Sequence, residues 1–254
     1  MCTLLIAWQA HPALALVVAA NRDETYDRAA EPAHFWPDAP GLLAGRDLQA
    51  GGTWLGVTRS GRFAALTNIR EPGVEAPHDA RSRGALVAEF LKGEEGPGEY
   101  LARVDPRRFA GFNLVVGTRA ELQFLNNRSG AAEAIEPGVH GISNATLDTP
   151  WPKVVRGRRA LAALVATGSV RGEQLLALLA DRTVAPDAEL PDTGVGLAAE
   201  RLLSPLFVAS PVYGTCCSTA LTISSRGEVE FSERTSNPRA IGGEVRFAFA
   251  LGSP

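Results

Sequence analysis

The chain of 254 residues is poor in several features, and each shortage argues against a class of protein. It has only three cysteines, an odd number that argues against the disulfide framework of a small secreted scaffold. Its apolar runs are too short to cross a bilayer and form no secretory leader, so we expect a cytoplasmic protein without stable membrane insertion. The net charge of −3 offers no basic surface to nucleic acid.

Metal-ligand patterns and lysine are also scarce. The four histidines are scattered along the chain: His11, His34, His78 and His140. None belongs to a paired ligand motif, and no C-x-x-C pair accompanies them, so we expect no metal site and no required cofactor. Without a C-x-x-C-H motif, any haem would bind non-covalently. Lysine occurs only twice beside abundant arginine and alanine, a bias that favours a GC-rich bacterial genome.

The apolar segments predict an α+β protein, because strands come in antiparallel hairpins with helices grouped between them. A single domain is expected over residues 1–254. Strands are predicted at 3–9, 13–21, 53–58, 62–68, 112–118, 121–127, 138–144, 220–225, 227–234 and 244–251. Helices are predicted at 82–93, 147–165 and 171–182, the second capped by Asp148 or Thr149. Residues 31–41 and 181–211 read as loops, the latter with a short helix near 198–203.

The second residue, Cys2, is the first candidate for chemistry. If the initiator methionine is removed, Cys2 carries a thiol and a free α-amine on one residue. The amine titrates near pH ~7.7 and can accept the thiol proton, so nucleophile and base arrive together. The alternative is that Cys2 is a small buried apolar residue at a strand start.

The segment "NRDE" ends the strand that pairs with the Cys2 strand. A short turn at "AHP" sets residue 2 opposite residues 20 to 22, so Arg22 or Asp23 should lie beside Cys2. A cation there would hold the thiolate and a carboxylate would orient the amine. The alternative is a solvated, charged strand end.

Other motifs allow two readings each. Asn68 and Asn144 both end strands, where their amides could donate to an oxyanion or cap a turn or helix. The glycines of "AGRDLQAGGTWLG" read as a tight turn, with Arg46 and Asp47 as a structural ion pair. Vicinal Cys216 and Cys217 should point to opposite faces of a strand and act in packing. These vicinal cysteines lack the spacing of a zinc site.

An ordered set of motifs resembles the NRDE family, the group of proteins similar to transport and Golgi organisation protein 2. The set comprises the initial "MC", "NRDE", "AGRD…GGTWLG", "LTNIR", "GISNATLDTPWPKV" and "YGTCCSTALTI". The resemblance implies a four-layer αββα sandwich of two mainly antiparallel sheets, similar to N-terminal-nucleophile hydrolases. It implies catalytic roles for Cys2, Arg22, Asp23, Asn68 and Asn144. The second arginine that related cysteine amidases carry on a late strand has no counterpart in "GTCCSTAL".

Two functions are therefore expected. The first is a cysteine N-terminal-nucleophile amidohydrolase acting on a small-molecule acyl amide other than a peptide. The second is a non-catalytic protein that binds or moves haem, an acyl thioester or a lipid in the same cleft. The sequence leaves the identity of the ligand and the oligomeric state open.

Overall fold

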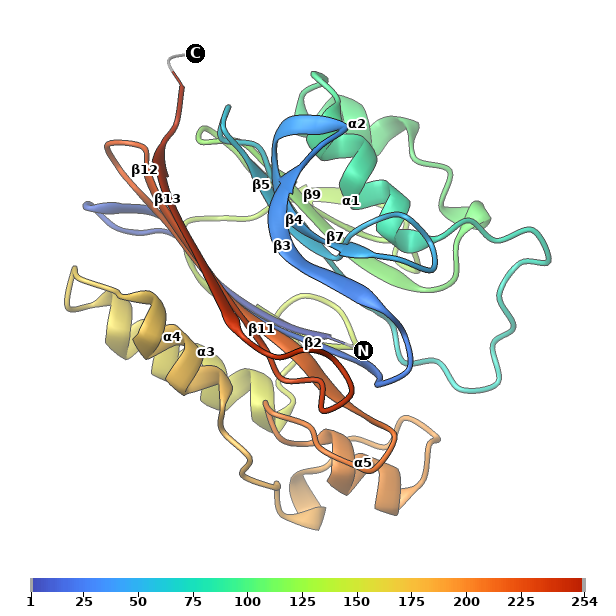
Figure 1. Cartoon of the computed structure of the whole chain (residues 1–254). Helices are drawn as coiled ribbons and strands as arrows, with labels where there is room; N and C mark the ends of the chain where they lie inside the picture. The colour runs from blue at the N-terminus through green and yellow to red at the C-terminus, as the bar shows by residue number, and fades with distance from the viewer. Residues whose placement is uncertain (1, 253–254) are drawn as a thin grey trace.

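Two antiparallel sheets lie face to face in a computed structural model of the chain, which describes residues 2–252 (Figure 1). The six-stranded sheet has the order β10-β1-β2-β11-β12-β13 and the seven-stranded sheet the order β3-β4-β5-β6-β7-β8-β9. The first sheet comprises β1 (Cys2–His11), β2 (Leu14–Thr25), β10 (Gly138–Ile142), β11 (Tyr213–Ser224), β12 (Glu228–Thr235) and β13 (Glu244–Ala250). The second comprises β3 (Ala30–Trp36), β4 (Ala39–Asp47), β5 (Leu55–Thr58), β6 (Phe63–Asn68), β7 (Phe112–Gly117), β8 (Leu122–Asn126) and β9 (Ala132–Ala134).

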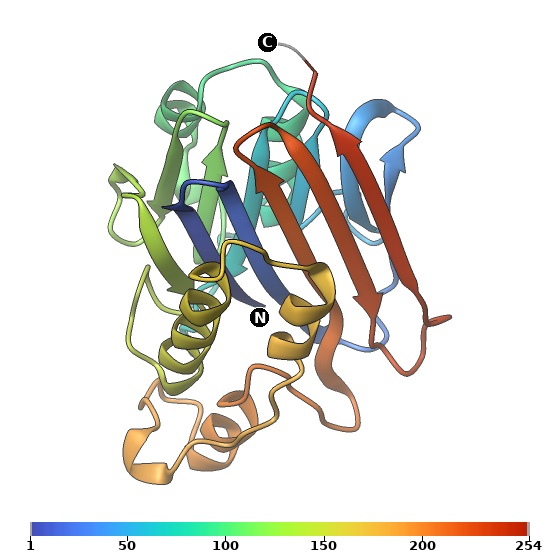
Figure 2. The same ribbon diagram turned by 90° about the vertical axis from the view of Figure 1, so that its left-hand side faces the viewer.

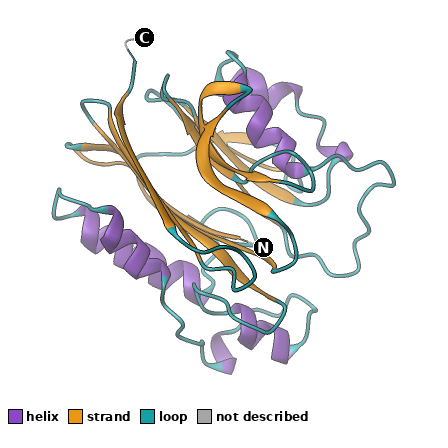
Figure 3. Ribbon diagram, viewed as in Figure 1, coloured by secondary structure: helices purple, strands orange, loops and turns teal. Residues whose placement is uncertain are grey.

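Helices cover the outer face of each sheet, which completes four layers (Figures 2 and 3). Helices α1 (Arg83–Lys92) and α2 (Pro97–Arg103) lie on the seven-stranded sheet, and α3 (Pro152–Val165) and α4 (Gly172–Leu179) lie on the six-stranded sheet. The short helix α5 (Leu197–Leu203) lies in the connection between α4 and β11, at one end of the sandwich. Two single turns complete the elements, η1 (Pro106–Arg108) and η2 (Asp187–Glu189). None of the helices in residues 2–252 is long and apolar enough to span a bilayer.

The apolar core has three parts, one in each space between layers. Alternation along β1 explains the division, because neighbouring side chains on a strand point to opposite faces. Leu4 and Ile6 belong to the cluster between the two sheets, whereas Leu5 and Ala7 belong to the cluster under α3 and α4. A third cluster fills the space between the seven-stranded sheet and α1 and α2. The predicted αββα sandwich is confirmed.

The structure corrects several local predictions. Residues 31–41, expected as a loop, hold most of β3 and the start of β4. Pro32 is tolerated because β3 is an edge strand, where a missing backbone N–H interrupts no ladder. Helix α3 begins after Trp151, not after Asp148 or Thr149. Asp148 instead adopts a positive φ of 56° and accepts hydrogen bonds from the Gly141 amide and His140. The short elements α2 and β9 were not predicted.

Candidate active site

The first hairpin sets Cys2 directly opposite Arg22, which lies within the predicted range of residues 20 to 22. Both residues continue the row of side chains that faces the space between the sheets, because Leu4 pairs with Ala20 two positions further along. Asp23 belongs to the opposite row and points toward the α3 and α4 side. The motif "NRDE" thus supplies side chains to both faces of β2.

Asn21 is an anchor for the site rather than a part of it. Its amide nitrogen donates to the carbonyl oxygens of Leu179 (3.0 Å) and Leu206 (2.9 Å), and its amide oxygen accepts from the Ser218 hydroxyl at 2.6 Å. These buried bonds tie β2 to the end of α4, to the segment before β11 and to β11 itself. The position of Arg22 and Asp23 therefore depends on a side chain without a chemical role.

An ion pair and an aromatic ring fix the position of the Arg22 guanidinium. It forms an ion pair with Asp47 at 3.0 Å, and it stacks on the Trp54 ring at 4.4 Å from the ring centroid. Arg28 joins the same carboxylate at 2.7 Å. The predicted pair of Arg46 with Asp47 is wrong, because adjacent residues of β4 point to opposite faces, and Arg46 pairs with Asp38 instead.

Cys2 lines a cavity of about 400 Å³ near one end of the sandwich. Its lining residues include four arginines, Arg22, Arg28, Arg81 and Arg83, and three acidic residues, Asp23, Glu24 and Asp47. Burial raises the pKa of the Cys2 thiol, while Arg22 and the backbone amide of Asp23 favour the thiolate. The thiol is therefore protonated at neutral pH and needs a base in order to react.

Asp23 lies in a buried charge cluster that sequence analysis missed. Its carboxylate accepts a hydrogen bond from the Thr215 hydroxyl at 2.7 Å, and burial raises its pKa against the field of Lys153. Lys153, in the first turn of α3, is 2% exposed, and burial lowers its pKa to about 8 while Asp23 opposes the shift. Arg70 and Glu200 complete the cluster with an ion pair of 2.6 Å.

Lys153 supplies a cation near Cys2 from a helix, whereas the missing second arginine was expected on a late strand. The electrostatic field of Cys2 is among the influences on the Lys153 pKa, and the same holds for Arg83. The only signals in the sequence were the rarity of lysine and the place of Lys153 in "PWPKV".

The two asparagines are brought together, but they differ in access to the cavity. Asn68 lines the cavity, whereas Asn144 is buried and does not. The Asn144 amide donates to the backbone oxygen of Asn68 at 2.8 Å, and the Asn144 carbonyl accepts from the Arg70 amide at 2.8 Å. Neighbouring Ser143 donates to the Cys2 carbonyl at 3.4 Å. The turn before α3 thus holds the starts of both β1 and the segment after β6. Asn144 caps no helix, because Trp151 is the N-cap of α3.

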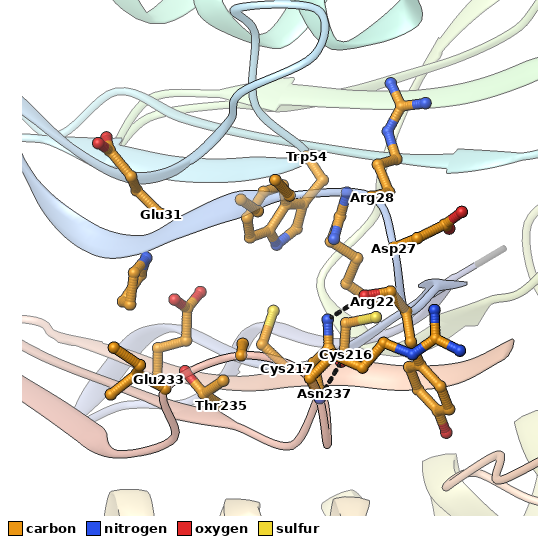
Figure 4. Close-up of a pocket in the computed structure, with 17 residues that line it drawn as sticks. Arg22, Asp27, Arg28, Glu31, Trp54, Cys216, Cys217, Glu233, Thr235 and Asn237 are labelled. Atoms are coloured by element: carbon orange, nitrogen blue, oxygen red, sulfur yellow. Dashed lines mark hydrogen bonds between the residues drawn. The ribbon is translucent and has the colours of Figure 1, made fainter. Parts of the chain in front are cut away.

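Vicinal Cys216 and Cys217 do not point to opposite faces as predicted. The pairing of β11 with β2 shifts between Thr215 and Cys217, so Cys216 is the extra residue of a β-bulge. Both thiols consequently line one further cavity, next to Arg22 (Figure 4). Burial raises the pKa of both.

Comparison with known proteins first establishes the class of fold. A Cys-to-Ala variant, at position 2, of the conjugated bile acid hydrolase from Clostridium perfringens has a TM-score of 0.56 at 8% identity, over 99% of this chain and 92% of that chain. A Caenorhabditis elegans orthologue of N-acylethanolamine-hydrolyzing acid amidase has a TM-score of 0.53 at 11% identity, over 87% and 92%. The fold is that of the N-terminal-nucleophile hydrolases.

Sequence comparison then gives the family. The sequence profile described as "Transport and Golgi organisation 2" matches residues 1–238. The bovine transport and Golgi organization protein 2 homolog is 33% identical over 262 residues, covering 92% of this chain and 93% of that protein. The Drosophila melanogaster protein is 28% identical over 266 residues, covering 92% of each. This chain belongs to the Transport and Golgi organisation 2 family, and the resemblance to the NRDE family is confirmed.

Proposed function

We propose that this protein is a cysteine amidohydrolase that cleaves a small-molecule acyl amide, with Cys2 as the nucleophile. The observation that carries the proposal is the position of Cys2 in the wall of a cavity, paired in register with Arg22 and influenced by Asp23. A fold shared with a conjugated bile acid hydrolase and an acid amidase supports the same reaction class.

In the proposed reaction, Cys2 becomes the first residue after removal of the initiator methionine, which lies outside the described residues. Its α-amine takes the thiol proton, and the sulfur forms a bond to the amide carbon. The side-chain amide of Asn68 donates to the developing oxyanion, and Asn144 positions Asn68 through the bond to its backbone. The ammonium returns the proton to the leaving amine as the C–N bond breaks. Water then hydrolyses the thioester and regenerates the thiol.

Arg22, Asp23 and Lys153 have supporting roles in this scheme. Arg22 stabilises the thiolate, because its charge lowers the pKa of Cys2. Asp23 orients the amine, and Lys153 favours the ionised form of Asp23 by opposing the effect of burial on its pKa. This arrangement would replace the second arginine by a lysine from α3.

A non-catalytic alternative is binding of an acyl ligand in the same cavity, and the raised pKa of the Cys2 thiol favours it. Haem fits the described residues less well. Neither the Cys2 cavity nor the cavity beside it has a histidine among its described lining residues, and the pKa of each of the three thiols is raised above its ordinary value. A cysteine that held haem iron would do so as a thiolate, and burial disfavours the thiolate form of all three cysteines. We therefore propose an acyl compound, not haem, as the ligand.

The test compares wild type with Cys2→Ala and Cys2→Ser on a panel of acyl amides. Loss of the nucleophile should reduce hydrolysis by several orders of magnitude, and the hydroxyl of the serine variant should restore little. Intact mass establishes whether Met1 is removed, and thermal unfolding establishes that the variants fold. A retained Met1, or equal hydrolysis by wild type and Cys2→Ala, would exclude the mechanism.

A further inference from the structure

A second cavity of about 440 Å³ adjoins the Cys2 cavity (Figure 4). Three residues line both cavities: Arg22, Arg28 and Trp54. The stacked pair of Arg22 and Trp54 therefore forms the edge along which the cavities meet. The volume of the second cavity falls in the range of roughly 300–1,000 Å³ that is typical of small-molecule sites.

Besides Trp54, the apolar lining residues of this second cavity come from three parts of the chain. The segment after β2 and the start of β3 contribute Ala29, Ala30 and Pro32. The bulge of β11 contributes its two thiols, and the connection between β12 and β13 contributes Ala240 and Ile241. Ile241 is 97% exposed, a large apolar side chain at the rim with nothing of its own chain covering it. Such a residue is suited to contact with an apolar ligand.

Several polar groups of this cavity are engaged with the protein, and the charged residues Asp27, Glu31 and Arg239 also line it. Glu233 points into the cavity, but one carboxylate oxygen accepts from the Ala33 amide at 2.8 Å and the other from the Thr219 hydroxyl at 3.1 Å. The Asn237 amide donates to the Tyr26 carbonyl at 2.9 Å. A ligand there would thus meet apolar surfaces of alanine, proline, isoleucine, tryptophan and cysteine, with charged side chains around them.

The Cys2 cavity is the more polar of the two, since Arg81, Arg83 and Glu24 line it beside the cysteine. An amide whose carbonyl lies at Cys2 has two substituents, the acyl chain and the amine part. The charged cavity suits a polar amine part, and the apolar cavity beyond the Trp54 edge suits the acyl chain.

We propose that the second cavity binds the apolar acyl chain of the substrate, so that the substrates are amides of medium- or long-chain carboxylic acids. This inference rests on the proposed function for the reaction, but it makes a separate claim about binding. It predicts that affinity grows with the length of the acyl chain.

The experiment measures kcat/KM for N-acylglycines with acyl chains of two to twelve carbons. A methylene that becomes fully buried contributes enough for a gain of about tenfold for every two added, until the cavity is full. Binding of N-decanoylglycine and N-acetylglycine to Cys2→Ala, by titration calorimetry, gives a readout that needs no hydrolysis.

Two variants change the second cavity, one by filling it and one by adding a charge, and a third variant serves as a matched control. Ala30→Trp occupies the cavity, and Ile241→Asp places a carboxylate at its exposed rim without touching the core. Both should remove most of the dependence on chain length. Ala134→Trp makes the same change on the edge strand β9, outside both cavities, and should keep the dependence.

The outcomes separate this inference from the proposed function. Hydrolysis that does not vary with chain length, or that varies equally in all variants, overturns the acyl cavity and leaves the amidohydrolase standing. Tight binding of N-decanoylglycine that Ile241→Asp abolishes, without turnover by wild type, supports the cavity and overturns the hydrolase. Absence of both turnover and chain-dependent binding overturns both.

Discussion

Replacing Asp47 by alanine should loosen Arg22 and lower stability. The Asp47 carboxylate accepts from Arg22 at 3.0 Å and from Arg28 at 2.7 Å, and it also accepts from the amides of Gln49 and Ala50. The Arg22 side chain is 6% exposed, so the variant leaves a cation in a nearly dry place without its counter-ion. Loss of one partner of a buried pair costs about 3–5 kcal/mol.

The expected loss for Asp47→Ala lies at the lower end of that range, about 3 kcal/mol. Arg28 is 29% exposed and can regain water, and Arg22 keeps its stacking on Trp54, which contributes about 0.5–2 kcal/mol. Asp47→Asn should lose about half as much, because an amide oxygen still accepts from the turn amides and from one arginine.

A matched control exists in the turn between β3 and β4. Asp38 also bridges two cations, Arg46 and Lys92, but its side chain is 47% exposed. Asp38→Ala should therefore change the unfolding free energy far less than Asp47→Ala, because solvent screens an exposed ion pair. Urea unfolding of the two variants measures the difference. Equal losses would refute the claim that burial of Arg22 makes Asp47 important.

The pH dependence gives a second check on Asp47. Its arginine partners hold the pKa of the Asp47 carboxyl below its ordinary value, although burial opposes them. The unfolded chain thus binds the proton more tightly, so the contribution of Asp47 is complete above its unfolded pKa and is lost as pH falls through the folded pKa. The gap between wild type and Asp47→Ala should close at acid pH. Alkylation of Cys2 should also be slower in the variant, since a displaced Arg22 no longer favours the thiolate.

Three further predictions concern the surroundings of the site. With only two lysines in the chain, ¹⁵N-lysine NMR should show one Nζ that titrates near pH 8, absent from Lys153→Arg; a single titration near 10.4 for both lysines would contradict the buried position. Asp148→Asn should lower the pKa of His140, which the ring-proton NMR shifts of His140 measure. The raised pKa of His140 stabilises the folded state only at pH values below the pKa in the folded state. The destabilisation by Asp148→Asn should therefore shrink as pH rises through that pKa. Gly214→Ala should destabilise by about 1–3 kcal/mol, because its Cβ would lie 2.3 Å from the Tyr26 hydroxyl, whereas Gly41→Ala meets nothing within 4 Å and should be neutral in thermal unfolding.

Most strands and helices could be predicted from local pattern, because runs of alternating or continuous apolar residues between turn signals reflect the layers they pack against. Two exceptions show where the local pattern misleads. Pro32 made β3 look like a loop, and only its place at the sheet edge makes the proline harmless. Asp148 looked like a helix cap, yet its carboxylate is engaged by His140, which lies eight residues earlier on β10.

The alternation of side chains along a strand could not predict that Cys216 and Cys217 line the same cavity. A β-bulge depends on how β11 pairs with β2, two strands separated by nearly two hundred residues. The true partners of Asp47 and the position of Lys153 near the site were missed for the same reason. Their roles arise from contact or electrostatic interaction with β2, and nothing in their own neighbourhoods of the sequence points to that strand.

The sequence by itself determined that Cys2 lies beside Arg22 or Asp23, because a short turn between two apolar strands leaves little freedom in register. A register shift between Trp8 and His11, which the sequence did not reveal, then sets Arg22 opposite Cys2. The tertiary structure alone decided which groups surround that pair. Burial and charge act through space, so the partners of Arg22 and Asp23 come from β4, α3 and β11, and the apolar cavity beyond Trp54 forms only where β3, β11 and the β12–β13 connection meet.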